Sequence, residues 1–345
     1  MIIPPIRGIA VRGALLLVAL ATLLVVAPDA TAQGTMHDGM DATPIVDAAA
    51  PVRWISYLSL FPLAGTLVFG VLVRKRLGAS HPELATALVA RARAAGLVAV
   101  MVLIPSLALE LYLQVRSFSL PGEPLTWDSA QPILMSTSWG HGWQWQAGAA
   151  LIAITGLLLA GRYASGWAVA GAGVVALIWT FPLTGHAVEH PWGEVVGVGL
   201  QGLHVAGGAA WLGTLTVLMA AVYPVIRTRT DREPVLARLV QGYSPLALVG
   251  AGTAVAAGVL LSLTDVASWD ALLHSTYGKA LLVKLAVLSG VIALGFYNWR
   301  RVRPALGAEP GARRLARSAS VELAIGTILL AVTAVLVALP APGLN

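Results

Sequence analysis

The chain has 345 residues, of which 57% are hydrophobic and only 11% are charged, and its mean hydropathy is +0.80. A soluble domain carries roughly 25% charged residues, so this composition excludes an ordinary water-soluble domain and indicates a protein surrounded by membrane lipid. The net charge is +6. The basic residues lie mainly in short loops between the apolar stretches, which argues against nucleic acid as a partner. The absence of cysteine excludes disulfides and thiolate metal ligands.

The N-terminus has the layout of a secretory signal peptide. Arg7 and Arg12 precede an apolar run over 13–27, and a small-residue Ala-Thr-Ala site ends at residue 32. This order of basic, apolar and small residues is typical of a segment that is removed on export. We therefore predict a signal peptide over 1–32; an uncleaved membrane anchor is the open alternative.

A short tail, 33–51, follows the predicted cleavage site. It contains Met36, His37 and Met40 within five residues. Thioether and imidazole groups suit Cu(I) or Cu(II), and a flexible segment needs no preformed pocket to bind them. We predict a periplasmic copper-capture segment here, with a chance clustering of these residues as the alternative.

Eight apolar stretches follow, each long enough to cross a bilayer. They predict an all-α polytopic membrane protein with eight transmembrane helices. The expected spans are 52–73, 94–115, 145–161, 164–182, 195–225, 241–264, 278–299 and 317–339.

The basic residues predict the orientation of these helices. Most of them fall in alternate loops, which marks those loops as cytoplasmic. Both termini are then outside, in agreement with the signal peptide, and the membrane is a bacterial-type inner membrane. The residues concerned are Arg74, Lys75, Arg76, Arg91, Arg93, Arg162, Arg227, Arg229, Arg232, Arg238, Arg300, Arg301, Arg303, Arg313, Arg314 and Arg317.

Short similarities indicate an internal repeat. The sequence STSWG begins at Ser136 before the third span, and STYG begins at Ser275 before the seventh. We predict two four-helix halves, residues 52–190 and 191–345, that run in the same direction. In transporters built from parallel repeats, substrate sites lie between such halves.

Histidines gather on the predicted outer side. Five of the seven lie in outer loops, and one, His204, lies inside the fifth span. An ionisable group at that depth is costly and indicates either a ligand or a structural hydrogen bond to a neighbouring helix. The outer five are His37, His141, His186, His190 and His274.

His186 and His190 are four residues apart, so one helical turn would point both imidazoles the same way. Their loop leads into the helix that carries His204, which predicts a metal site formed by His186 and His204, with His190 as a third candidate ligand. The alternative is a solvated loop. His141 lies among three tryptophans at the start of the third span; an interfacial aromatic belt explains the tryptophans, and His141 is a further candidate ligand.

Three charged residues lie inside the other spans. Lys284 lies at a depth similar to that of His204, where a cation opposes metal binding, so we expect it to pair with Glu110. Glu322 lies within reach of Arg300, Arg301 or Asn298. These groups form structural pairs or part of an exit path.

Several segments together resemble the copper resistance protein D (CopD) family. From Tyr243 to Pro342 (243–342) the chain contains STYGKALLVKL from Ser275, NWRRVRPAL from Asn298 and SVELAIG from Ser320. Upstream, TGHA from Thr184 and the segment from His204 to Gly213 resemble the family's central region. The third span begins WQWQ, where the family leads us to expect a basic residue.

The resemblance implies an inner-membrane protein that is not an enzyme and that moves copper inward from the periplasm, often with a small periplasmic chaperone of the CopC type. By position it implies His186 and His204 as ligands, with Lys284 and Glu322 as motif residues. The sequence contains no CopC-like domain, so we expect either a separate chaperone as partner or the short Met36–Met40 tail in its place. The oligomeric state is not indicated.

Two other functions remain open from the sequence. Paired imidazoles on neighbouring helices bind haem b in membrane electron-transfer proteins, but that role needs a second histidine at the depth of His204. A membrane assembly or sensor protein that does not transport is the other alternative. No phosphate-binding loop for ATP is found in the sequence.

Overall fold

The computed structural model describes residues 49–119, 124–266, 268–302, 304, 309–339 and 341–343. These residues form an all-helical bundle, and no strand occurs among them. The predicted signal peptide and the tail with Met36, His37 and Met40 lie outside the described residues. In lipid a chain must satisfy its backbone hydrogen bonds within each segment, which is why apolar stretches of this length become helices.

The N-terminal part of the bundle contains four long helices, one short helix and two 3-10 turns. These are α2 (Ala49–Leu77), α3 (Pro82–Ser117), α4 (Trp127–Ser136), α5 (Ser138–Leu159), α6 (Gly166–Thr180), η1 (Phe181–Thr184) and η2 (His186–Glu189).

The C-terminal part begins with one continuous helix that π-helical turns interrupt twice. It comprises α7 (Glu194–Gly208), η3 (Ala209–Gly213), α8 (Thr214–Val217), η4 (Leu218–Val222) and α9 (Tyr223–Ile226). The remaining elements are α10 (Arg232–Asp265), α11 (Trp269–His274), α12 (Thr276–Tyr297), the π-helical turn η5 (Asn298–Val302) and α13 (Glu309–Ala338).

Seven helical segments in the described residues are long and apolar enough to cross a membrane. They are Ala49–Leu77, Pro82–Ser117, Gly166–Thr184, Glu194–Ile226, Arg232–Asp265, Thr276–Val302 and Arg313–Ala338. The expected span 145–161 corresponds to α5, which has 22 residues but is not among the seven. Its first turns carry Trp143, Gln144, Trp145 and Gln146, which lower its hydropathy.

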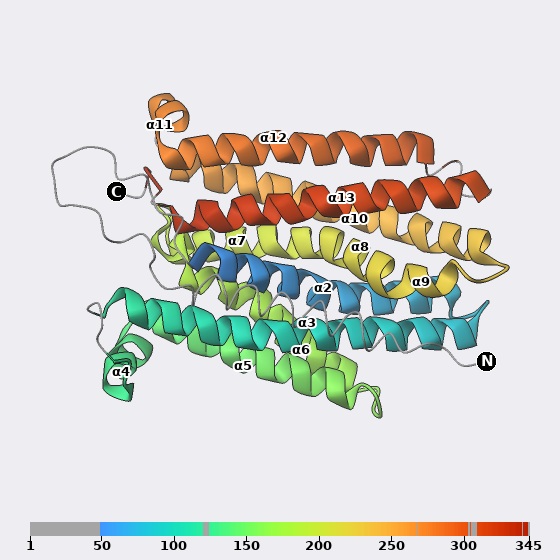
Figure 1. Ribbon diagram of the computed structural model, residues 1–345, viewed down its shortest axis with the longest axis horizontal. Helices are drawn as coiled ribbons and strands as arrows, with labels where there is room; N and C mark the ends of the chain where they lie inside the picture. The colour runs from blue at the N-terminus through green and yellow to red at the C-terminus, as the bar shows by residue number, and fades with distance from the viewer. Residues whose placement is uncertain are drawn as a thin grey trace.

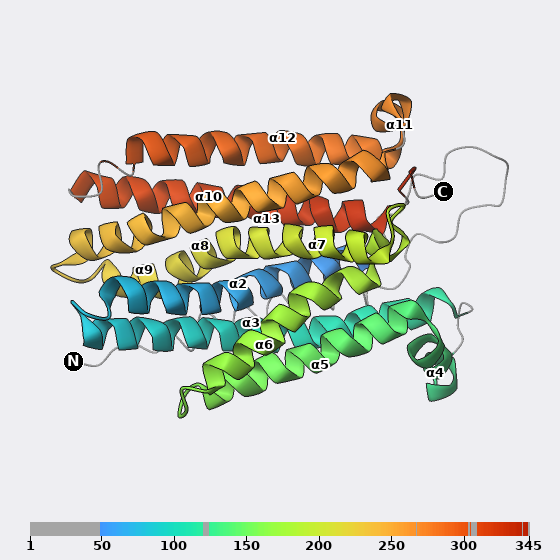
Figure 2. The same ribbon diagram turned by 180° about the vertical axis from the view of Figure 1, so that it is seen from behind.

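The long helices run roughly parallel to one another, with α5 and α6 on one side of the bundle and α12 on the other (Figure 1). Figure 2 shows the same order from behind, with α4 and α11 at the same end of the bundle. This end is called the α11 end below. Helix α2 lies in the centre, and 72% of its most apolar stretch is buried, against 11% for Thr276–Val302, so α12 is peripheral.

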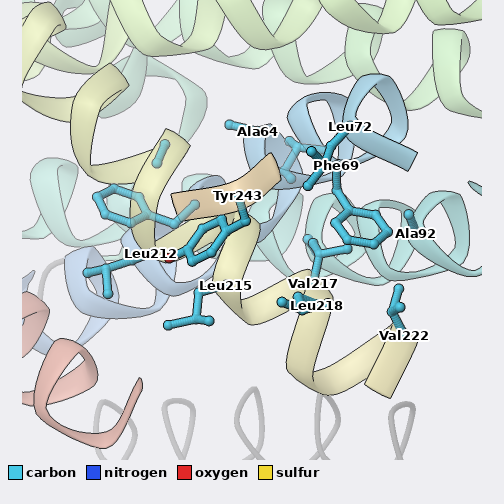
Figure 3. Packing of buried hydrophobic residues seen from close by; sticks show 14 of the residues in the cluster. Ala64, Phe69, Leu72, Ala92, Leu212, Leu215, Val217, Leu218, Val222 and Tyr243 are labelled. Atoms are coloured by element: carbon cyan, nitrogen blue, oxygen red, sulfur yellow. The ribbon is translucent and has the colours of Figure 1, made fainter. Parts of the chain in front are cut away.

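The core lies where α2 meets α3 and the helix that carries η3 and η4. Phe69 and Leu218 are almost fully buried there, and Figure 3 shows Phe69 close to Ala92, Val217 and Leu218. The two backbones touch at Gly65, where a Cβ would lie 2.1 Å from the carbonyl carbon of Gly213. Only glycine permits so close an approach of two helices.

Two corners at the α11 end have the same local geometry. In the first, α4 leads into α5 through Thr137, whose hydroxyl donates to the Ile133 carbonyl (2.6 Å) and accepts from the Gly140 N–H (2.9 Å). A Cβ on Gly140 would lie 2.1 Å from the Ile133 carbonyl oxygen. The short helix therefore folds back directly onto the start of the long one.

In the second corner α11 leads into α12 through Ser275. Its hydroxyl donates to the Ala271 carbonyl (2.5 Å) and accepts from the Gly278 N–H (2.9 Å). A Cβ on Gly278 would lie 2.3 Å from the carbonyl oxygen of Leu272. Segments 138 residues apart (137 and 275) thus use the same cap and the same glycine contact.

Candidate metal site

His204 is held by a hydrogen bond between two helices. Its Nδ1 on α7 lies 2.7 Å from the carbonyl oxygen of Ala254 on α10. Because a carbonyl oxygen only accepts, Nδ1 carries the proton and Nε2 keeps its lone pair. A Cβ on Gly258 would lie 2.9 Å from the ring, so this glycine leaves room for the imidazole. The result is an oriented imidazole with one nitrogen available for a metal, the arrangement common among metal-binding histidines.

His204 lines a cleft of about 530 Å³ between α7, α10, α12 and α13. Most of the lining is apolar, and its polar groups besides His204 include Gln201 of α7 and the ammonium of Lys284 on α12. Lys284 lies close enough to His204 for its charge to act on the imidazole. Exposed apolar side chains, among them Leu263 and Trp269, stand at the edge of the cleft, so it opens toward the surroundings of the bundle.

His186 lies in η2, near the α11 end. Its Nε2 is 3.1 Å from the carbonyl oxygen of Val337 on α13. Nε2 must carry the proton, and Nδ1 keeps its lone pair. The same carbonyl accepts a hydrogen bond from the Arg53 guanidinium (3.2 Å). His186 is therefore a second imidazole with an available nitrogen, beside a cation.

His190 has both ring nitrogens engaged. Nδ1 accepts from the backbone N–H of Trp192 (3.2 Å), and Nε2 lies 3.1 Å from the hydroxyl of Thr264 on α10. That hydroxyl donates to the Leu261 carbonyl, so it accepts from Nε2. The residue is only 5% exposed. In this arrangement His190 connects the loop to α10 and has no free lone pair for a metal.

The expected helical turn that points His186 and His190 the same way is not found. Residues His186–Glu189 form a 3-10 turn, and His190 has extended backbone angles (φ −61°, ψ 133°). A 3-10 helix has three residues per turn, so positions i and i+4 do not share a face. The two imidazoles consequently bond to different helices, α13 and α10.

The imidazoles lie at two depths. The partners of His190 and His204 on α10 are Thr264 and Ala254, ten positions apart, which corresponds to about 15 Å along a helix. In the described parts of the chain, no group of three or more His, Cys, Asp or Glu side chains lies close enough to hold a metal ion. The structure thus does not bring His186, His190 and His204 around one ion. His186 and His204 stay predictions as single ligands, and His190 would bind a metal only after losing its hydrogen bond from Trp192.

Asp265 is a residue of this region that the sequence does not single out. It ends α10, and its carboxylate accepts from the hydroxyl of Tyr277 (2.7 Å). Lys284, and His186 and His190 when they are protonated, lie close enough for their charges to act on it. Asp265 directly follows Thr264, the partner of His190, so it lies at the outer of the two depths. In sequence it is one of many outer acids, and only the fold places it beside the histidines.

His141 is exposed in the first turn of α5. The neighbouring Trp143 donates its indole N–H to the Leu107 carbonyl (2.8 Å) and Gln144 donates to the Leu134 carbonyl (2.7 Å), so these residues fasten α5 to α3 and α4. His141 as a ligand stays a prediction.

The buried charges have partners that differ in part from those expected. Lys284 is not paired with Glu110: the Glu110 carboxylate accepts from Ser56 (2.6 Å) on the neighbouring helix α2, whereas Asp265 is the acid whose charge acts on Lys284. Glu322 does accept from Asn298 (3.1 Å), as expected, and also from the indole N–H of Trp211 (2.8 Å).

Comparisons with known proteins define the class of this bundle. Residues 40–194 match the family model for the copper resistance protein D-like N-terminal domain, and residues 237–336 match copper resistance protein D. The two models cover most of the bundle, including the segments around His186 and Lys284. The chain therefore belongs to the copper resistance protein D family.

One curated relative is the copper transport protein CutJ of Bacillus subtilis (strain 168), which is 30% identical over 181 residues. The alignment covers 48% of this chain and 31% of that protein, so the chain spans about a third of the relative's length. No solved structure matches the chain.

Proposed function

We propose that this protein carries copper inward across the bacterial inner membrane, using His186 near the outer surface and His204 within the membrane as successive ligands. The family is one of copper resistance and transport. The observation that carries the proposal is the uncommitted Nε2 of His204, on the wall of a cleft inside the bundle. An ionisable side chain at such a depth marks a pathway more often than a structural contact.

The surroundings of both imidazoles favour passage over storage. The Arg53 guanidinium shares its acceptor with His186, and the Lys284 ammonium acts on His204. A nearby cation weakens the binding of Cu(I) or Cu(II). Transport needs binding that is favourable enough to attract the ion and weak enough to release it. A single imidazole beside a cation meets that requirement.

The topology proposed with this function has eight spans in two parallel four-helix halves, with both termini in the periplasm. It counts α5 as a span. A helix of 22 residues is about 33 Å long, which is enough to cross the hydrocarbon core of a bilayer. The shared geometry of the Thr137 and Ser275 corners supports the repeat. The α11 end is then the periplasmic end, and a CopC-like chaperone would deliver copper there. The proposal also includes removal of the signal peptide 1–32 on export.

Copper uptake into liposomes that contain the purified protein tests the proposal. We expect time-dependent uptake by the wild type, measured with radioactive copper supplied separately as Cu(I) and Cu(II). His204→Ala should lower the initial rate roughly ten- to hundredfold, the range seen when a metal site loses one supporting group. His186→Ala should raise the copper concentration needed for half-maximal uptake.

His274→Ala is the matched control. His274 also lies at the α11 end, but it is exposed, and its Nδ1 lies 3.0 Å from the carboxylate of Asp270 within its own short helix. Its removal should leave uptake unchanged. Uptake by His204→Ala at the wild-type rate, in protein that elutes as a single folded species, would overturn the proposed role of His204. Absence of uptake by the wild type with either ion would overturn transport.

A further inference from the structure

Glu322 is a buried carboxylate whose partners come from three other helices. It is 7% exposed and lies on α13. One oxygen accepts from the indole N–H of Trp211 in η3 (2.8 Å), and the other accepts from the side-chain amide of Asn298 in η5 (3.1 Å). Tyr243 of α10 lies close enough for the charge of Glu322 to act on it. The four long helical segments of the C-terminal part thus meet at this one group.

No ion pair of Glu322 is found among the described residues. The side chains that face it are Trp211, Asn298 and Tyr243, of which only Tyr243 titrates, and Tyr243 donates its hydroxyl to the Trp211 carbonyl (3.2 Å). Burial without a counter-ion favours the protonated acid, whereas the two N–H donors favour the carboxylate. The proton affinity of Glu322 therefore depends on whether both donors stay in place.

Both donors lie in π-helical turns. Trp211 belongs to η3 and Asn298 to η5. Such turns contain one residue more than an α-helical turn and are frequent at functional sites. Conversion of either turn to α-helix would shift its residues around the helix axis and remove the donor from Glu322. Both donors to the carboxylate thus lie where a helix departs from α-helical geometry.

Trp211 also connects Glu322 to the copper pathway. Its side chain lines the same cleft as His204 and Lys284, and it follows His204 by seven positions, about 10 Å along the helix. A cation in the cleft stabilises a negative charge on Glu322, and a proton on Glu322 weakens the binding of that cation. The two binding events oppose each other by linkage.

We infer that Glu322 is the proton-binding group of this transporter and that copper entering the cleft displaces the proton from its carboxyl, so that copper and protons exchange across the membrane. The inference rests on the proposed transport of copper and adds the coupling ion. The step breaks the O–H bond of the protonated Glu322 carboxyl and transfers that proton to water on the side from which copper came. No electron moves.

The test is copper uptake into liposomes at different internal pH values, with the membrane potential held at zero by potassium and valinomycin. If one proton exchanges for each ion, one pH unit sustains a roughly tenfold copper gradient. We expect wild-type accumulation to follow the imposed pH difference. Glu322→Gln should equilibrate copper without responding to it, and Glu322→Asp should restore part of the response.

Glu110→Gln is the matched control, because Glu110 is a second intramembrane carboxyl bonded to a different partner, Ser56. It should keep the wild-type response. Trp211→Phe removes one donor but keeps the acid, so Glu322 should hold its proton more tightly and the midpoint of the pH dependence should move to higher pH. If Glu322→Gln does not fold, Trp211→Phe still tests whether Glu322 binds the exchanged proton.

The outcomes separate the two proposals. Wild-type uptake that ignores the pH difference, or a Glu322→Gln variant that still follows it, overturns the inference and leaves copper transport standing. An unshifted midpoint in Trp211→Phe also overturns it. Failure of the wild type to take up copper at any pH overturns transport itself.

Discussion

The two corners at the α11 end differ in what stands nine positions after the cap. In the first corner this residue is Gln146 (137 to 146), and in the second it is Lys284 (275 to 284). Gln146 is fully buried, and its amide donates to the Thr180 carbonyl (3.0 Å) and the Thr184 hydroxyl (2.9 Å). Lys284 instead lines the cleft between α12 and its neighbours. The same backbone motif thus supports a sealed contact in one place and a polar wall in the other.

The difference follows from the helices that pack against each corner. Helix α5 is covered by α6 and η1, which close over Gln146, whereas α12 packs mainly against α13 and leaves a space toward α7 and α10. A neutral amide suits the closed environment because its NH2 group donates to two neighbours, although its buried Oε1 has no partner among the described residues. An ammonium suits the open environment because Asp265 lies near. The comparison teaches that the same corner seals a helix contact in one half of the bundle and borders a cleft in the other.

The largest expected effect comes from giving the closed corner the residue of the open one. Gln146→Lys places an ammonium at a site that is fully buried, with only a carbonyl and a hydroxyl as partners. An uncompensated buried charge costs about 3–5 kcal/mol. We expect loss of most of the folded protein, measured by yield and elution in detergent. The reciprocal change Lys284→Gln should fold, and equal behaviour of the two variants would break the comparison.

A smaller effect, the same in both corners, is expected from the glycines. Gly140→Ala and Gly278→Ala each introduce a Cβ within 2.3 Å of a carbonyl oxygen, so the short helix must move away from the long one. Overpacking of this kind costs about 1–3 kcal/mol. Both variants should lower the thermal unfolding midpoint, followed by tryptophan fluorescence. Gly148→Ala in α5, where a Cβ meets nothing within 4 Å, is the control and should leave the midpoint unchanged.

The smallest effect is expected from the caps. Thr137→Ala and Ser275→Ala each remove a hydroxyl that accepts from the N–H of the glycine three positions later. Loss of such a cap costs about 1 kcal/mol. The two variants should lower the unfolding midpoint by similar amounts, and Thr137→Ser should restore the first. A lower unfolding midpoint in only one of the two variants would show that the same hydrogen bonds do not contribute the same free energy in the two corners.

Much of the helical architecture can be predicted from the sequence because apolar stretches of span length leave a chain in lipid few alternatives. Seven of the expected stretches coincide with helices that meet the criteria for a span. The stretch 145–161 does form a helix, α5, but its polar aromatic start leaves it outside that set. The position of His204 inside a helix also followed from the sequence.

The hydrogen-bond partners within the site could not be predicted, because they depend on contacts between distant segments. The spacing of His186 and His190 indicated a shared face, yet the 3-10 turn separates them. The use of the His190 lone pair depends on Trp192 and Thr264. Asp265 lies near His186, His190 and Lys284 only because distant segments pack together. No local sequence pattern predicts that packing.

The peripheral position of α12 has a consequence for experiments on this protein. Because no helix among the described residues closes one side of the cleft, we expect acyl chains of the surrounding bilayer to complete its wall. Detergent tails differ from acyl chains in length and order, so a micelle changes what stands at this side of the cleft. Affinities measured in micelles and in bilayers should therefore differ for this protein, and the bilayer values describe the membrane-embedded state.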